Sequence, residues 1–294
     1  MTPTLPLRDG PHRIVSVSAA PYDGYAFPRV LESLAAIGAT HVEPAFIVGY
    51  TEPFDESSFL PAEAAKHASW LRDYGIRCHA FSSHIDLGRA DAVEVFLRRM
   101  DFARALGARV INTNAARRAW GERFFENIVP LARHAEALDM WIGLENPGDG
   151  SDNLLNTAAD AAALLARIGH PRVGLNYDAG NTISHRPGVD TAADALAAMP
   201  HCVHTHVKDV RAGADGYFFV PLGEGGVGCA RIVDAIRATP LDVSIEIPMR
   251  LHRRPDAQPN RAPYRVPVES IESVLSAALA FVNAHLAAAD VANA

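Results

Sequence analysis

The sequence is poor in cysteine, and it lacks both an export signal and a long apolar run. Its 294 residues include only three cysteines, Cys78, Cys202 and Cys229, which lie far apart. Such spacing supplies neither a disulfide framework nor a Cys-x-x-Cys metal motif, so we expect buried thiols in a reducing cytoplasm. The first residues, MTPTLPLRDGPHR, contain no apolar signal core, and no run approaches the roughly 18 apolar residues of a membrane span. We therefore expect a soluble cytoplasmic chain with no membrane partner.

Basic charge is also scarce. The chain has 27 lysines and arginines against 34 aspartates and glutamates, which gives a formal net charge of -7. Binding to nucleic acid or to an anionic membrane would favour a basic face. The charge balance therefore predicts no nucleic-acid partner and favours a small molecule.

Short apolar runs rich in β-branched residues alternate with longer helical patterns along the chain. Helical patterns cover residues 28–38, 61–75, 90–107 and 124–139, and several of them close on a glycine, a typical helix stop. The spacing between the short runs is roughly 30 residues, the length of one βα unit. The eight runs are residues 13–19, 41–46, 77–85, 108–114, 141–147, 173–181, 203–210 and 242–248.

Eight strand-helix repeats without a break in composition predict an α/β fold, a (β/α)8 TIM barrel that spans residues 1–294 as a single domain. With 49% hydrophobic residues, a chain of this length can bury a large core. The alternative is an open, doubly wound sheet. No Gly-x-Gly-x-x-Gly motif follows the first run, which disfavours it.

Polar residues follow or end most of the predicted strands. Active sites of (β/α)8 barrels lie at the carboxyl ends of the strands, so these residues form the predicted site. Several carboxylates at one barrel mouth would repel one another, and a divalent cation is the simplest compensation. The residues are Glu43, His84, Asn112, Asn114, Glu145, Asn146, Asp178, Asn181, His206, Lys208 and Glu246.

The strongest subset is Glu145, Asp178, His206 and Glu246. One imidazole with three carboxylates suits Mn²⁺, Mg²⁺ or Co²⁺ and tolerates Zn²⁺. The alternative is a polar plug in which the four groups only bind one another.

Four motifs occur in a fixed order: GLENPGDG, NYDAGN, HTHVKD followed by PLGEGGVG, and SIEIP. In this order they resemble the sugar phosphate isomerase/epimerase superfamily, whose members have xylose isomerase-like barrels. That superfamily includes ketose 3-epimerases, inosose dehydratases and type IV AP endonucleases. The resemblance implies that Glu145, Asp178, His206 and Glu246 hold one divalent metal ion, with Mn²⁺ preferred, and that Glu145 and Glu246 also act as acid and base.

Departures from the superfamily patterns narrow the expected function. The three-zinc endonucleases need an Asp-x-His pair where this chain has Tyr217 and Phe219, and a histidine where it has Asn181. Aromatic and amide side chains do not replace those ligands. The ketose 3-epimerases continue their metal-histidine strand with Gly-Glu, whereas this chain has Lys208 and Asp209, which looks more like the inosose dehydratase and uncharacterised isomerase branches.

His204, His206 and Lys208 share one face of a predicted strand. Spacing alone allows both histidines to chelate one ion. His206 is nearer the strand's carboxyl end and matches the superfamily's metal histidine, while His204 lies one layer lower, where we expect a hydrogen bond within the barrel. Lys208 either acts on the substrate or forms an ion pair with a carboxylate such as Glu224.

These residues predict a metal-dependent isomerase or epimerase of carbohydrate metabolism. It would remove a proton next to the carbonyl of a polyhydroxy substrate and form an enediolate. An inosose-type dehydratase, in which Lys208 protonates the leaving hydroxyl, is the first alternative. A non-catalytic sugar-binding barrel is the second.

Further side chains are predicted to contact the substrate. Glu43 either orients a metal ligand or binds a hydroxyl, Asn114 and Asn146 are candidate supporting donors, and His185 lies on a loop. We interpret residues 221–228 as a tight turn rather than a phosphate cradle. The predicted substrate contacts are His84, Glu43, Asn114, Asn146, Asn181, Arg211 and Arg250.

Two long segments are predicted to lie at the barrel mouth, residues 47–61 and 249–268. Loops of this length often act as lids. The second is a basic, proline-rich arm that includes Arg250, and it either binds an anionic substrate group or pairs with an acidic subunit of a homodimer or homotetramer. Residues 287–294 are predicted to be a frayed tail.

Overall fold

Parallel strands form a ring at the centre of the computed structural model, which describes residues 3–6 and 13–287. In this part of the chain a nine-stranded sheet runs in the order β3-β2-β1-β11-β8-β7-β6-β5-β4. Every predicted apolar run contains at least one of its strands. They are β1 (Val15–Ser18), β2 (His41–Glu43), β3 (Arg77–Cys78), β4 (Ala80–Ser82), β5 (Val110–Asn114), β6 (Trp141–Glu145), β7 (Val173–Asp178), β8 (Cys202–Val207) and β11 (Val243–Ile245).

β3 and β4 share the third position of the barrel. β3 pairs with β2, and β4 pairs with β5, so the chain crosses from one neighbour to the other at His79. The carbonyl of His79 accepts hydrogen bonds from the amides of both Arg109 and Val110. This crossing nearly closes the ring, and the predicted α/β barrel is confirmed over the open sheet.

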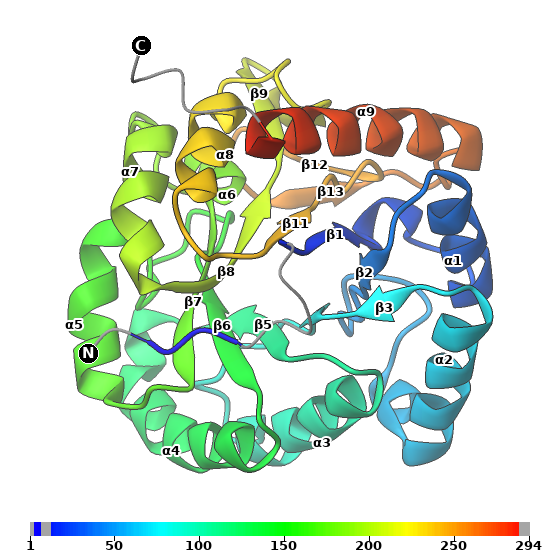
Figure 1. The fold of residues 1–294 in the computed structure, drawn as a ribbon. Coiled ribbons are helices and arrows are strands. Elements are labelled where there is room, and N and C mark those ends of the chain that lie inside the picture. The colour runs from blue at the N-terminus through cyan, green and yellow to red at the C-terminus, as the bar shows by residue number, and fades with distance from the viewer. Residues whose placement is uncertain (1–2, 7–12, 288–294) are drawn as a thin grey trace.

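Helices surround the strands on the outside of the ring (Figure 1). Their apolar faces pack on the sheet, as parallel strands buried on both faces require. α6 is an extra helix that begins directly after β7. The helices are α1 (Phe27–Ala36), α2 (Pro61–Asp73), α3 (Ala92–Ala105), α4 (Gly121–Ala137), α5 (Ala158–Ile168), α6 (Ala179–His185), α7 (Thr191–Ala198), α8 (Cys229–Arg237) and α9 (Val268–Ala287).

α9 is apolar for a surface helix. Among the described residues it alone is long and apolar enough to cross a membrane by length and composition, so the expectation of no such segment was too strict. One helix of this kind is weak evidence for a membrane span. Its buried residues Ile271, Leu275, Ala278 and Val282 recur every three or four positions and face the barrel, the pattern of a core-packing helix. The predicted tail lies outside the described residues except for Ala287.

A second, four-stranded antiparallel sheet covers part of the barrel mouth. It runs β13-β12-β10-β9, with β9 (Asp209–Gly213) and β10 (Gly216–Val220) following β8, and β12 (Leu251–Arg253) and β13 (Pro259–Arg261) following β11. The segment 249–268 is predicted as an extended arm that binds either an anionic substrate group or an acidic partner subunit, and in the structure part of it forms a hairpin that pairs with β10 of its own chain. The prediction missed this because the pairing partner lies about 35 residues earlier in the sequence.

The glycine-rich loop 221–228 wraps around the carboxylate of Asp209. That carboxylate accepts hydrogen bonds from the amides of Gly223, Gly225 and Val227 at 2.9, 3.0 and 3.1 Å. A side chain at position 225 would bring its Cβ to 2.2 Å from Asp209 Oδ1, so glycine is required there. The loop's amide donors therefore bind an internal carboxylate, in agreement with the predicted tight turn.

Removing this carboxylate should destabilise the protein. In Asp209→Ala three loop amides, one of them buried and two part-buried, lose their acceptor, and we expect the free energy of unfolding to fall by about 3 kcal/mol. Urea unfolding followed by circular dichroism measures the change. Asp215→Ala, at an exposed position beyond β9, is the matched control and should leave stability within about 0.5 kcal/mol of the wild type. Equal effects of the two substitutions would contradict this account of the loop.

Candidate active site

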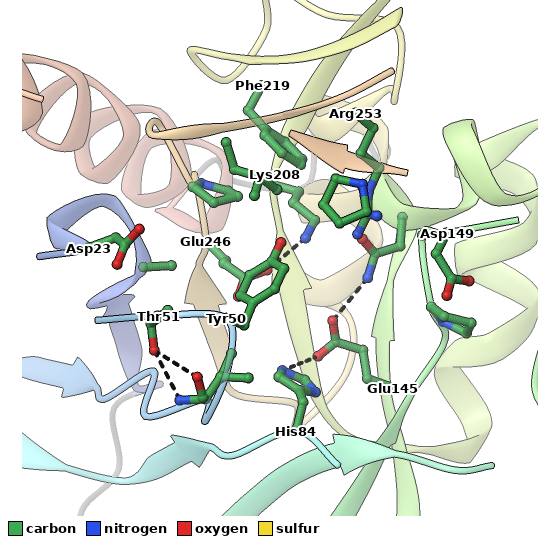
Figure 2. A pocket seen from close by; sticks show the side chains of 18 of the residues that line it. Asp23, Tyr50, Thr51, His84, Glu145, Asp149, Lys208, Phe219, Glu246 and Arg253 are labelled. Atoms are coloured by element: carbon green, nitrogen blue, oxygen red, sulfur yellow. Dashed lines mark hydrogen bonds and ion pairs between the residues drawn. The ribbon is translucent and has the colours of Figure 1, made fainter. Parts of the chain in front are cut away.

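A cavity of about 360 Å³ opens at the carboxyl ends of the barrel strands. Residues from the barrel form its floor, and residues from the 47–61 loop and the second sheet form its walls (Figure 2). Its polar lining residues are Asp23, Tyr50, Thr51, His84, Asn114, Glu145, Asp149, Asn181, Lys208, Glu246, Arg250, Arg253 and Gln258.

The four predicted metal ligands lie together at the floor of this cavity. One ligand atom from each of Glu145, Asp178, His206 and Glu246 lies within 4.8 Å of all the others. His206 Nδ1 is 3.2 Å from Glu145 Oε2 and 3.5 Å from both Asp178 Oδ2 and Glu246 Oε2. Four strands distant in sequence thus bring one imidazole and three carboxylates to one point.

Glu43 holds the other nitrogen of the His206 ring. His206 Nε2 is 2.9 Å from Glu43 Oε1, and the two side chains are fully buried. Burial alone would lower the pKa of His206, but the Glu43, Glu145 and Glu246 carboxylates outweigh it and raise that pKa well above its ordinary value. Burial would likewise raise the pKa of Glu43, yet His206 and His204 hold it well below its ordinary range. Glu43 therefore orients the imidazole, as second-sphere carboxylates do for metal-binding histidines.

His204 belongs to this lower layer. Its Nε2 lies 3.1 Å from Glu43 Oε2 and 2.9 Å from Ser244 Oγ. Glu43, His204 and His206 also bring ligand atoms within 4.8 Å of one another. However, Glu43 already accepts from Ser82 and Asn112, and these side chains have no access to the cavity. We interpret this second group as an internal hydrogen-bond network.

Lys208 lies beside the four clustered groups. Its Nζ is 2.7 Å from Asp178 Oδ2 and 2.6 Å from Glu246 Oε2. The predicted ion pair is therefore present, but with these carboxylates; Glu224 is exposed on the 221–228 loop. Burial would lower the pKa of Lys208, and the attraction of Asp178 and Glu246 raises it instead. Burial would also raise the pKa of Asp178, whereas Lys208 and His206 lower it.

Two amides hold the Glu145 carboxylate. Asn181 Nδ2 donates to Oε1 at 3.0 Å and Asn176 Nδ2 to Oε2 at 2.7 Å. Burial would raise the pKa of Glu145, but His206 and His84 lower it. The sequence analysis missed Asn176. Its spacing of two residues from Asp178 on the same strand face could have revealed it.

Three predicted substrate contacts are placed elsewhere. Glu43 is buried below the floor, and Asn146 is buried against Asp178, whose amide and carbonyl it binds at 2.9 Å each, so both have the supporting positions that were one of the predicted alternatives. Arg211 is exposed on β9 and does not line the cavity. A prediction based on strand ends could not resolve depth along the barrel, which decides these cases.

The remaining predicted contacts line the cavity. These are His84, Asn114, Asn181 and Arg250. His84 Nε2 lies 3.7 Å from Glu145 Oε2. Arg250, however, forms ion pairs within its own chain. Its Nη1 lies 3.4 Å from Asp23 Oδ2 and 3.1 Å from Glu52 Oε2.

His185 is a structural residue. Its Nδ1 accepts from the amide of Gly150 at 3.1 Å, and its Nε2 lies 2.9 Å from Asn156 Oδ1. These contacts fix the loop between β6 and α5. Burial lowers the pKa of His185 to about 4, with nearby Arg186 adding to the effect.

The donor set fits a divalent cation. Asp178 Oδ2 is buried and has Lys208 as an ion-pair neighbour, but among the described residues no hydrogen-bond donor is aligned with it. Glu43, Glu145, Asp178 and Glu246 together carry four negative charges when ionised. Lys208 and a protonated His206 balance only two of them, which leaves room for the charge of a divalent cation. Carboxylate oxygens with one imidazole suit Mn²⁺, Mg²⁺, Co²⁺ or Zn²⁺.

Comparisons with known proteins agree with the barrel. Residues 31–271 match the family model described as xylose isomerase-like TIM barrel. A search of curated protein sequences gave no match.

Solved structures with the same fold are numerous. A D-psicose 3-epimerase from Clostridium cellulolyticum H10, solved with D-tagatose, is 14% identical with a TM-score of 0.71, covering 93% of this chain and 99% of that one. The probable 3-DHS dehydratase AsbF from Bacillus anthracis is 16% identical with a TM-score of 0.67, covering 92% and 98%. A xylose isomerase-like TIM barrel protein from Mycobacterium smegmatis, in complex with magnesium, is 17% identical with a TM-score of 0.70, covering 94% and 98%.

The two histidines of β8 should differ in their effect on metal binding. His206→Asn should weaken Mn²⁺ binding by about tenfold or more, because it removes a ligand and its link to Glu43. His204→Asn should retain most of the affinity. Calorimetric titration with MnCl₂ measures both. An equal loss in the two variants would show that both histidines bind the ion.

His185 should make stability depend on pH. Above pH 6.5 it is neutral in both the folded and unfolded states, whereas between pH 6.5 and about 4 only the unfolded chain takes up the proton. Its contribution to stability therefore falls as the pH falls through this window. Urea unfolding across the window should show a shallower pH dependence for His185→Gln than for the wild type. Identical slopes would contradict the assignment.

Proposed function

Because this chain belongs to the xylose isomerase-like TIM barrel family, we propose that the cavity is the active site of a divalent-metal-dependent isomerase or epimerase. Its substrate would be a small polyhydroxy carbonyl compound, a sugar or a cyclitol. One observation carries the proposal: of the four clustered groups, Glu145 and Glu246 line the cavity, while Asp178 and His206 lie beneath it. Two carboxylates thus face the substrate, supported by two groups that do not.

Glu145, Asp178, His206 and Glu246 would hold one ion, with Mn²⁺ the first choice and Mg²⁺, Co²⁺ or Zn²⁺ the alternatives. When bound, the cation would stabilise the negative charge that develops on the substrate oxygens as the neighbouring carbon loses its proton. The likeness to proteins such as a D-psicose 3-epimerase and a magnesium complex supports this choice of chemistry.

Glu246 is the better placed general base. Its Oε2 pairs with Lys208 at 2.6 Å, while no described residue donates a hydrogen bond to its Oε1. Both oxygens of Glu145 accept amide hydrogen bonds, which makes it the weaker base. The two glutamates enter the pocket from different sides (Figure 2). Glu246 would remove the proton, and Glu145 would return it to the other face or to the adjacent carbon.

Lys208 supports a second candidate, dehydration. Its ammonium group lines the cavity next to Glu246, where it could donate a proton to a departing hydroxyl group as the base takes the carbon-bound proton. The probable dehydratase among the structural neighbours has the same fold. In an isomerase the same ammonium would instead stabilise the enediolate.

His84, Asn114 and Asn181 would bind substrate hydroxyl groups from the cavity wall. Tyr50 and Phe219 narrow the mouth and would limit the access of water. The scarcity of cysteine and the acidic net charge support a cytoplasmic location without nucleic-acid partners, and we propose a homodimer or homotetramer as the assembly.

Glu246→Gln should abolish turnover. We expect the rate of solvent-deuterium exchange into keto sugars and inososes to fall by about 10²–10⁴-fold, because the general base is lost. Mass spectrometry measures the exchange, with added Mn²⁺ and with EDTA. The metal content of the variant shows whether a catalytic group or the ion was lost.

Glu224→Gln, on the exposed 221–228 loop, is the control and should exchange like the wild type. Exchange without loss of water supports isomerisation or epimerisation, and an enone absorbance supports dehydration. No exchange by the wild type with any substrate would contradict both and favour a non-catalytic sugar-binding barrel. Wild-type rates in Glu246→Gln would contradict its role as the base.

A further inference from the structure

Arg253 differs from the other arginines of the 249–268 segment. Arg250 and Arg261 pair with Asp23 and Glu52, and Arg254 lies 3.5 Å from Asp256. Arg265 donates to the carbonyl of Gly24 and lies over the Tyr25 ring. In the described part of the chain Arg253 forms no ion pair, although it lines the cavity.

The Arg253 side chain is held in place without a direct ion pair to any carboxylate of the described residues. Its Nη1 donates to the carbonyl of Ala257 at 3.2 Å, while its Nε is buried without a hydrogen-bond partner. The guanidinium lies against Gly148, where a Cβ would come within 2.8 Å of Cζ, Nε and Nη2. Glycine at this position therefore lets the guanidinium reach the cavity wall from β12 (Figure 2).

The nearest acidic side chains of the cavity are engaged elsewhere. The Asp149 carboxylate and Arg253 attract each other, but they do not form an ion pair, and Asp149 Oδ1 accepts from the amide and hydroxyl of Ser151 at 3.0 and 2.7 Å. Asp23 pairs with Arg250 and Arg261, and Glu246 pairs with Lys208. The cavity wall therefore presents a fixed cation with an unused donor.

We propose that Arg253 binds an oxyanion of the substrate, so that the substrate is an acidic polyhydroxy compound rather than a neutral sugar. This deepens the proposed function and rests on the same cavity. A guanidinium offers paired donors that match a carboxylate or a phosphate group, and a half-buried one such as Arg253 prefers such a partner over a hydroxyl. The carboxylate is the favoured form, because Arg253 is the one cavity cation in the described residues without an acidic partner, and a phosphate dianion would be only half balanced.

Unreactive polyols test this proposal separately from catalysis. Three polyols of similar chain length differ at one end. D-Glucitol is neutral there, D-gluconate carries a carboxylate, and D-glucitol 6-phosphate carries a phosphate group. Each is titrated calorimetrically into the full chain with MnCl₂ present. We expect gluconate to bind more tightly than glucitol. We also expect Arg253→Gln to weaken gluconate binding by about 10- to 100-fold while glucitol binding changes by less than about threefold.

Arg254→Gln is the matched control, since Arg254 is adjacent in sequence, exposed and outside the cavity lining. It should bind all three ligands like the wild type. If glucitol 6-phosphate binds more tightly than gluconate, and Arg253→Gln removes this difference, Arg253 is an oxyanion site but the choice of carboxylate is overturned. The absence of any anion preference, or a preference that Arg253→Gln leaves intact, would overturn the proposal. A failure of deuterium exchange, by contrast, bears on the proposed reaction and does not affect these titrations.

Discussion

The imidazole of His206 is the point on which the polar interior of this barrel depends. It contacts Glu43 on one side and faces Glu145, Asp178 and Glu246 on the other. Buried carboxylates are costly unless a positive charge or a donor meets each of them. His206 and Lys208 supply part of the compensating positive charge inside a wall of apolar strands. β8 lies between β7 and β11, so His206 and the following Lys208 are placed between acidic strand ends and reduce the repulsion among their carboxylates.

Support and reactivity are separated by depth along the barrel. The lower layer, with Glu43, His204 and Asn176, contains no cavity-lining residue and serves to orient the layer above. The upper layer contains Glu145, Glu246 and Lys208, which do reach the cavity. Groups held by a second set of hydrogen bonds keep their geometry when the substrate enters, which lowers the cost of reaching the transition state.

The sequence predicted the barrel and the clustered groups well, because both depend on periodic and local patterns. Apolar runs at βα spacing located all eight strand positions, and strand-end motifs located Glu145, Asp178, His206 and Glu246. It left open whether Glu43 and Asn146 support neighbouring side chains or meet substrate, because their depth below the floor depends on strand stagger. It failed for the 249–268 segment, because a hairpin that pairs with a distant strand leaves no local signal.

The sequence by itself determined which residue types stand at the carboxyl ends of the strands, since strand periodicity fixes the face on which each side chain lies. Only the tertiary structure decided which of them meet, and which charges remain unbalanced. Arg250, Arg253 and Arg261 look alike in a basic, proline-rich stretch. The packing of the hairpin on β10 gives two of them acidic partners and brings the third, against Gly148, to the cavity. Charge pairing depends on distances between remote segments, and those distances exist only in the folded chain.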